Sequence, residues 1–503
     1  MSNKQAVFTS GSTMRHVLVM TAASATGLLT MFGVDMVDMY FLTLLGETEL
    51  AAAVGYAGTL IFFLVAVSIG LQIALGALVA RSEGAMRRDL ASRYCSSGLL
   101  FSFLASVVIS LLGWIWLREL LQLLGAGGST LDYAVSYANI LLPNMPVLVL
   151  GMSAAAGVRA VGDARRSMWA TVAGSLVNAV LDPLFIFTFG WGLEGAAWAS
   201  VVARLVVFLV AWHAIYHVHR LPVKISWQEF VEDLGPLMKI ATPAILTNLA
   251  TPIGGSFVLR TMSQFGDSAV AGAAIMGRIT PVAFCAIFAL SSAVGPIIGQ
   301  NAGAGLYDRV RSTLRDAMTF NAVYVLLVWW LMWLLGDLIV TAFSASDEAA
   351  DLILFYCNFL TGAFIFNGAL FVANASFNNL RHPHWATGFN FGRVLLGTIP
   401  AAYLGGSGTA RAAYWRARRL ARWPLDYWLW SRRFASLIGW SVSTPRSRTR
   451  IRWKAWIPSG ARRSRLGSGL GAMLVEGAVQ PFTRGFGNAI ASHRIFLACP
   501  GAL

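Results

Sequence analysis

Charged side chains are scarce in this chain. Only 12% of its 503 residues are Asp, Glu, Lys or Arg, whereas 57% are hydrophobic. Soluble domains carry about 25% charged residues, so this composition excludes an ordinary soluble fold. Cysteine is also rare, and no two of the four form a C-x-x-C pair: Cys95, Cys285, Cys357 and Cys499. This scatter argues against zinc or redox roles and favours cysteines that only pack.

The first hydrophobic run is not preceded by a short apolar segment with a small-residue cleavage site, so we expect the first helix to act as its own signal. Apolar runs long enough to cross a bilayer as helices recur along the chain. Ten are complete, at about 15–45, 50–80, 96–117, 133–158, 167–189, 195–217, 237–264, 268–300, 316–343 and 350–379, and an eleventh begins near 385. The chain is therefore predicted to be an all-α polytopic membrane protein, with kinks at prolines such as Pro143 and Pro281.

Basic residues are concentrated in alternate connections between these runs. Arg87 and Arg88 lie in one such connection and Arg165 and Arg166 in another, whereas the intervening segments GETE at 46–49 and FGDS at 265–268 have no Lys or Arg. By the positive-inside rule, this pattern places the N-terminus in the cytoplasm. We expect a multi-pass protein of a bacterial-type inner (plasma) membrane.

The sequence contains an internal repeat. LLGETELAAAVGYAG at 44–58 resembles QFGDSAVAGAAIMGR at 264–278, and GALVARSEGAMRRDL at 76–90 resembles GPIIGQNAGAGLYDR at 295–309, with offsets of 220 and 219 residues. Such a repeat predicts two six-helix lobes of the same topology, as in transporters whose halves face each other across a cleft. The predicted domains are a first lobe at 1–219, a polar cytoplasmic linker at 220–236 and a second lobe at 237–405.

The segment 406–503 lacks the apolar runs that the repeat requires. After Gly405 there are 17 Lys and Arg residues against Asp426 and Glu476, a net charge of +15 that equals the formal excess of the whole chain. One interpretation is a basic amphipathic tail. We favour a frameshift, because a shifted frame permits a string such as LWYGARGVLAG, whose small residues match Gly192 and Gly195 of the first lobe. The second lobe is then truncated after its eleventh helix begins.

Acidic residues inside the predicted spans of the first lobe are few. Asp35 and Asp38 share a helix face in the first run, and Asn178 and Asp182 share a face in the fifth. Charges at membrane depth are costly and indicate function. These oxygens suit a hard monovalent cation, or a proton held between two acids. The alternatives are that Asp182 only caps a turn broken by Pro183, and that Asp35 lies at an aqueous mouth.

Other polar residues in the spans allow two interpretations. Arg260 and Arg278 either line a substrate cavity or pair with helix dipoles inside the protein. His213, His217 and His219 have a zinc-like spacing, but histidines at the membrane interface are the simpler interpretation. The sequence shows no His–Asp/Glu or H-E-x-x-H constellation, so we predict that the protein is not an enzyme.

Several motifs together resemble the multidrug and toxic compound extrusion (MATE) family over residues 10–405. The matching segments are VDMYFLTLLGETELAAA, GVRAVGDARRSMW, NAVLDPLFIF, GLEGAAWAS, GPIIGQNAGAGLYDR and SFNNLRHP. The resemblance implies a twelve-helix, two-lobe antiporter that expels amphipathic, often cationic compounds in exchange for inward Na⁺ or H⁺.

Carried over by position, the resemblance assigns a cation site in the first lobe to Asp38, Asn178, Asp182 and Ser200, with Asp35 as a weaker member. The second-lobe segment VLLGTI has no acid at the matching place, so the coupling site is expected in the first lobe only. The first helix has Ala23 where its repeat counterpart has Pro243, so a proline-bending mechanism of the first helix is not carried over.

The predicted function is cation-coupled multidrug efflux by alternating access, with Na⁺ or H⁺ as coupling ion and no cofactor. We expect small amphipathic or cationic drug-like substrates, surrounding membrane lipid, no nucleic-acid partner and a monomeric protein. Two alternatives stay open. One is a lipid-linked precursor flippase of the same superfamily, which would prefer a larger, more cationic cavity, and the other is an inactive product of a frameshifted transporter gene.

Overall fold

The described chain is helical throughout. The computed structural model describes residues 6–45, 48–262, 267–345 and 347–400, and no strand occurs among them. Contacts divide the chain into two units after Ala435, and all described residues belong to the first unit. The predicted all-α class is therefore confirmed. The predicted tail at 406–503 and its frameshift lie outside the described residues.

The first lobe follows a short 3₁₀ turn, η1 (Val7–Thr9). Its helices are α1 (Thr13–Thr43), α2 (Thr48–Gly84), α3 (Arg88–Ile115), α4 (Leu117–Leu123), α5 (Gly128–Leu141), α6 (Met145–Ala160), α7 (Ala164–Pro183) and α8 (Gly192–Trp212). Helices α7 and α8 continue into the π-helical turns η2 (Leu184–Thr188) and η3 (His213–Val218).

The second lobe has the same succession of elements. Its helices are α9 (Trp227–Met262), α10 (Asp267–Ala283), α11 (Cys285–Gly303), α12 (Tyr307–Ala342), α13 (Asp347–Phe355), α14 (Phe364–Asn379) and α15 (Pro383–Gly392). The turns η5 (Tyr356–Leu360) and η6 (Thr361–Ala363) join α13 to α14, and η7 (Arg393–Thr398) continues α15.

Helix starting points show the internal repeat directly. The pairs α3 and α12, α5 and α13, and α7 and α15 begin at Arg88 and Tyr307, Gly128 and Asp347, and Ala164 and Pro383. Each second-lobe helix thus starts 219 residues after its first-lobe counterpart, which is one of the two offsets predicted from sequence. Two lobes built from one repeat are confirmed.

All ten complete apolar runs fall on helices or helix pairs. By length and composition, eight helices of the described residues can cross a membrane, and nine can if the bent pair α5 and α6 forms one span. That pair bends by 53° around Pro143, as the proline predicts. Helix α9 is not among the eight, and it contains Pro236, Pro243 and Pro252.

The predicted linker at 220–236 is only partly a connection. Helix α9 already begins at Trp227, because Ser226 and Glu229 form a capping box: Glu229 accepts the Ser226 N–H at 2.8 Å, and the Ser226 hydroxyl accepts the Glu229 N–H at 3.2 Å. The loop proper is therefore 220–226. Of the cysteines, the three described ones are buried and free of disulfides, and Cys499 lies outside the described residues.

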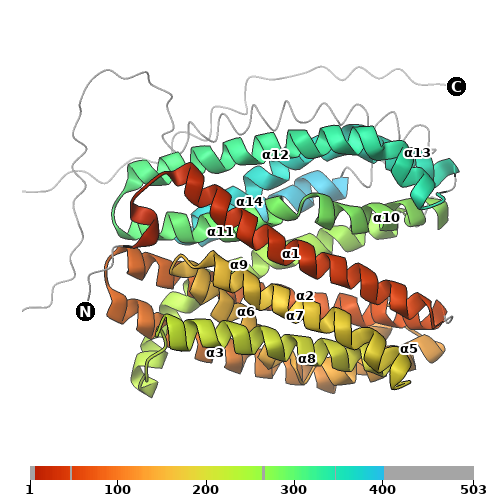
Figure 1. The fold of residues 1–503 in the computed structure, drawn as a ribbon, viewed down its shortest axis with the longest axis horizontal. Coiled ribbons are helices and arrows are strands. Elements are labelled where there is room, and N and C mark those ends of the chain that lie inside the picture. The colour runs from red at the N-terminus through yellow and green to blue at the C-terminus, as the bar shows by residue number, and fades with distance from the viewer. Residues whose placement is uncertain (1–5, 46–47, 263–266, 346, 401–503) are drawn as a thin grey trace, which may run out of the picture. The chain divides into compact units, whose positions relative to one another are not determined.

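Helix α1 lies between the two lobes and packs on α7 of the first and α11 of the second, while α2 packs on α9 (Figure 1). At the end of the molecule that carries the N-terminus, η1 joins the lobes. The buried Phe8 donates its N–H to the side-chain carbonyl of Gln300 at 3.0 Å, and the Gln300 amide donates to the Ala160 carbonyl at 2.8 Å. Gln300 belongs to α11 and Ala160 to α6, so one side chain spans both lobes.

Candidate cation site in the first lobe

Two first-lobe helices bring three polar side chains together within predicted spans. Asp38 lies in α1, while Asn178 and Asp182 lie one turn apart in α7. The Asn178 amide donates to one oxygen of Asp38 at 2.9 Å and to one oxygen of Asp182 at 2.8 Å. The two carboxyl groups therefore share a single donor nitrogen, although Asp38 and Asn178 are 140 positions apart in the sequence.

The site is largely closed off. Asn178 and Asp182 are 6% and 1% exposed, and Asp38 is partly exposed. Helix α1 can lie close to α7 because Gly27 faces it: a β-carbon at Gly27 would be only 3.4 Å from the Thr171 side chain. A missing side chain in α1 thus helps to position Asp38 against α7.

Each carboxyl group keeps one oxygen that lacks a donor. The Oδ1 atoms of Asp38 and Asp182 are buried, and neither accepts a hydrogen bond within the described part of the chain. Burying a carboxylate oxygen without compensation costs several kcal/mol. Two such oxygens beside each other can be compensated by a bound cation or by a proton shared between the acids. The arrangement fits both chemistries.

The chain around Asp182 departs from a regular helix. Proline at position 183 lacks an N–H, and the chain continues from there into the π-helical turn η2. Gly195 of α8 packs against this turn, since a β-carbon there would come within 2.7 Å of the Phe185 backbone. The alternative that Asp182 merely caps the broken turn does not match, because its hydrogen bond comes from the Asn178 side chain rather than from a backbone N–H.

The remaining predicted members of the site lie outside this hydrogen-bonded trio. Ser200 of α8 is half-buried and contacts the Tyr137 phenol of α5, and that phenol also lies near both carboxyl groups. Asp35 is exposed and neighbours Asp38. Tyr137 was not predicted, because one tyrosine among the apolar residues of α5 carries no distinguishing pattern.

The predicted substrate-cavity arginines are both exposed. Arg260 lies near the end of α9 and Arg278 in α10, and both belong to the second lobe, apart from the first-lobe trio. A third guanidinium, that of Arg393 in η7, donates to the Asn367 side-chain oxygen at 2.7 Å. Sequence reasoning missed Arg393.

The histidines near the end of η3 do not form a metal site. His219 bonds to the Asp163 carboxylate at 3.0 Å, and no group of three or more His, Cys, Asp or Glu suited to a metal occurs among the described residues. At the repeat offset of 219, Asp38 corresponds to Phe257 and Asn178 to Gly397, so these two second-lobe counterparts carry no carboxyl or amide side chain. The counterpart of Asp182 lies beyond residue 400, outside the described residues.

The MatE family model matches two stretches of this chain, residues 23–184 and 243–404. The two stretches begin 220 residues apart and so correspond to the two lobes. A FAD transporter of Shewanella oneidensis is 27% identical over 397 residues, which cover 78% of this chain and 88% of that protein. The multidrug export protein MepA of Staphylococcus haemolyticus is 24% identical over 347 residues, covering 67% and 74%.

Solved structures have the same fold. A structure described as the outward-facing conformation of a multidrug resistance MATE family transporter of the MOP superfamily matches with a TM-score of 0.79 at 22% identity, over 86% of this chain and 98% of the other. A MATE structure in the bent conformation matches with a TM-score of 0.77 at 22% identity, over 87% and 98%. Because the family model covers more than half of the chain and both lobes, the chain belongs to the MATE family of multi-span membrane transporters.

Proposed function

We propose that this protein is a cation-coupled efflux antiporter that exports small amphipathic or cationic drug-like compounds in exchange for Na⁺ or H⁺. The observation that carries the proposal is the Asn178 amide shared by Asp38 and Asp182, with one donor-free buried oxygen left on each acid. No cofactor enters the proposal. The protein acts as a monomer in a bacterial inner membrane, with its N-terminus in the cytoplasm.

The coupling ion is held in the first lobe. Asp38 and Asp182 neutralise the ion's charge with their oxygens, or share the proton, while Asn178 keeps the two carboxyl groups at a fixed separation. Ser200, beside Tyr137, offers a hydroxyl to complete the ligand shell. Because Asp38 belongs to α1, and α1 also packs on α11 of the second lobe, a change of charge at Asp38 acts on the helix between the lobes.

Alternating access follows from where the lobes meet. At the N-terminal end, Gln300 connects η1 in front of the first lobe, α6 within it and α11 of the second. Towards the other end of the spans, Asp35 and Arg278 are exposed. This distribution supports a conformation closed on the cytoplasmic side, in which the ion is taken up from outside. Release of the ion inwards then requires the Gln300 contacts to break.

Export tests the proposal in cells that lack their own exporters, with the reading frame after codon 405 corrected. Asp38→Asn and Asp182→Asn should abolish gradient-driven dye export, whereas Asp337→Asn removes an exposed carboxylate of α12 and should leave export unchanged. Comparing export with and without a sodium gradient identifies the ion. Undiminished gradient-driven export by Asp38→Asn would reject the assignment.

A second substrate class has a specific observation in its favour. The FAD transporter relative aligns over 78% of this chain, and the second lobe places Arg260, Arg278 and Arg393 at positions within spans. Basic side chains there favour an anionic substrate, such as a flavin dinucleotide, or the lipid-linked precursor of a flippase. Export of FAD into the medium, measured by its fluorescence beside dye export, distinguishes these classes.

A further inference from the structure

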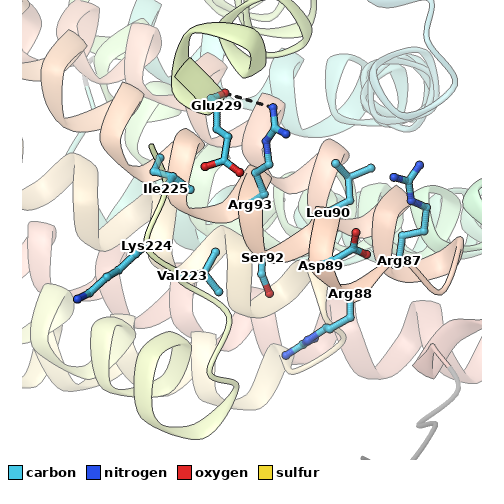
Figure 2. Close-up of a pocket in the computed structure, with 10 residues that line it drawn as sticks. All are labelled: Arg87, Arg88, Asp89, Leu90, Ser92, Arg93, Val223, Lys224, Ile225 and Glu229. Atoms are coloured by element: carbon cyan, nitrogen blue, oxygen red, sulfur yellow. Dashed lines mark hydrogen bonds between the residues drawn. The ribbon is translucent and has the colours of Figure 1, made fainter. Parts of the chain in front are cut away.

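A pocket of about 450 Å³ lies at the N-terminal end of the first lobe, apart from the cation site (Figure 2). One wall is the first turn and a half of α3, from Arg87 to Arg93, and the other is the loop segment 223–225 with Glu229 of α9. Ser96 fastens this loop to α3, because its hydroxyl both donates to the Val223 carbonyl and accepts the Val223 N–H, each at 2.8 Å. The pocket is therefore built from both walls and held in shape.

Basic side chains predominate in its lining. Four line it, Arg87, Arg88, Arg93 and Lys224, against the two acids Asp89 and Glu229. Arg93 is paired with Glu232 and Asp233 at 2.8 and 3.0 Å, and Arg88 with Glu83. Within the described chain, Arg87 and Lys224 have no carboxylate at ion-pair distance, and both are exposed. Two cations on opposite walls are thus available to a ligand.

The acidic members of the lining do not neutralise these two cations. The Glu229 carboxylate accepts hydrogen bonds from the N–H and the hydroxyl of Ser226, at 2.8 and 2.9 Å, so it is directed towards its own capping box. The first N–H groups of α3 have no side-chain cap. A helix start with free N–H groups adds to the positive potential between Arg87 and Lys224.

The pocket lies where a spanning helix begins. Helix α3 is one of the membrane spans and starts at Arg88, and the loop beside it exposes apolar side chains: Val223 is 47% exposed, Trp227 70% and Val231 49%. An exposed tryptophan beside basic residues is typical of the membrane interface, and basic pockets there bind lipid phosphates. We propose that this pocket binds a phosphate group, supplied by the head group of an anionic phospholipid, between Arg87 and Lys224.

Occupancy of this pocket connects the two lobes. Arg87 belongs to the start of α3 in the first lobe, whereas Lys224 belongs to the loop that leads directly into α9, the first helix of the second lobe. A phosphate bound by both would hold that loop against α3. Phospholipid composition would then bias the movement of one lobe against the other, independently of which ion or substrate the protein transports.

The test uses the purified full-length chain in mixed micelles with equal amounts of phosphatidylglycerol and phosphatidylcholine, and counts retained lipids by native mass spectrometry. Relative to the unmodified protein, the double variant Arg87→Gln/Lys224→Gln should retain about one phosphatidylglycerol fewer per chain, with an apparent Kd about tenfold higher. The swapped variant Arg87→Lys/Lys224→Arg keeps both charges and should retain the lipid.

A matched control separates this pocket from general attraction by basic residues elsewhere. Arg311→Gln/Arg315→Gln removes two exposed cations from the corresponding start of α12 and should leave lipid retention within about twofold of the unmodified protein. Equal loss of phosphatidylglycerol in both double variants, or loss in neither, would overturn the proposal. So would inorganic phosphate, if in phosphatidylcholine micelles it raised the melting midpoint as much as phosphatidylglycerol does, since the site would then serve a soluble anion.

Discussion

Gly84, the last residue of α2, lies so close to Gln300 of α11 that a β-carbon at position 84 would overlap the Gln300 carbonyl oxygen. The contact is reciprocal, because a β-carbon at Gly303 of α11 would overlap the carbonyl oxygen of Arg81 in α2. The two lobes therefore meet backbone to backbone at this end. The same Gln300 uses its side chain to hold Phe8 and Ala160.

This contact predicts that Gly84→Ala opens the N-terminal end of the molecule. An added methyl group cannot fit, and overpacking of this kind costs about 1–3 kcal/mol, which is roughly a fivefold to hundredfold shift away from the closed arrangement. Spin labels at Ala85 and Ala304, both exposed, should report a longer distance between α2 and α11. Gly55→Ala in the same helix meets nothing within 4 Å and should leave the distance unchanged. An unaltered distance in Gly84→Ala would mean that this contact does not determine closure.

The sequence could predict positions along the chain better than distances across it. The apolar runs located the helices, and the repeat gave the offset of 219 at which second-lobe helices begin, because both follow from local hydrophobicity. The Asn178 and Asp182 pair follows from helical spacing alone. That Asp38 reaches Asn178 depends on how α1 packs on α7, which no spacing states. Its assignment to the same site came from family resemblance.

Other features left no pattern to find. The Gln300 contacts run to backbone groups of Phe8 and Ala160, and backbone groups carry no sequence signal. The pocket between α3 and the loop depends on Ser96 binding Val223, a contact between residues 127 positions apart. The start of α9 was recoverable in principle, since Ser226 and Glu229 form a recognisable capping box within the segment interpreted as a linker.

Removing the bridge at the cation site should weaken ion binding without abolishing it. In Asn178→Ala both carboxyl groups persist but lose their common donor. Leaving buried acceptors without that donor costs about 1–3 kcal/mol, so we expect a lower melting midpoint. If the ion is Na⁺, adding sodium in place of choline at constant ionic strength should raise the midpoint of the unmodified protein, raise it less at equal concentration in Asn178→Ala, and not raise it in Asp38→Asn. Asp35→Asn is the control and should keep the full sodium response. An equal response in all four proteins would place the ion elsewhere.

The Asp163 carboxylate, between α6 and α7, predicts a dependence of stability on pH. Hydrogen bonds from His219 and then from Arg166 hold the pKa of Asp163 well below its usual range. A lowered pKa in the folded state means that the stabilisation is complete above about pH 4, the ordinary aspartate value, and is lost as the pH falls towards the folded-state pKa. The difference in melting midpoint between the unmodified protein and Asp163→Asn should therefore be constant near neutral pH and shrink below about pH 4.

Asp163→Ala provides the comparison for that experiment. Asp163 caps α7 by accepting the Arg166 N–H at 3.1 Å, and asparagine can keep this cap whereas alanine cannot. Alanine should therefore destabilise the protein by about 1 kcal/mol more than asparagine does, and this additional loss should not change with pH. Identical melting curves for the two variants would show that the charge, and not the cap, is all that Asp163 contributes.

The basic segment after Gly405 predicts a property of the gene. If a single base was gained or lost there, restoring it opens a hydrophobic frame that completes the eleventh helix and adds a twelfth, as the six-helix first lobe and the 219-residue offset require. Resequencing the gene from its source and measuring the mass of the expressed protein test this directly. A corrected chain should show gradient-driven export that the 503-residue chain lacks, because an incomplete second lobe cannot close the pathway on both sides in turn. If no single-base change gives an apolar frame, and the intact mass matches the 503 residues, the basic segment is a genuine tail and the second lobe must function with the helices that α9 to α15 provide.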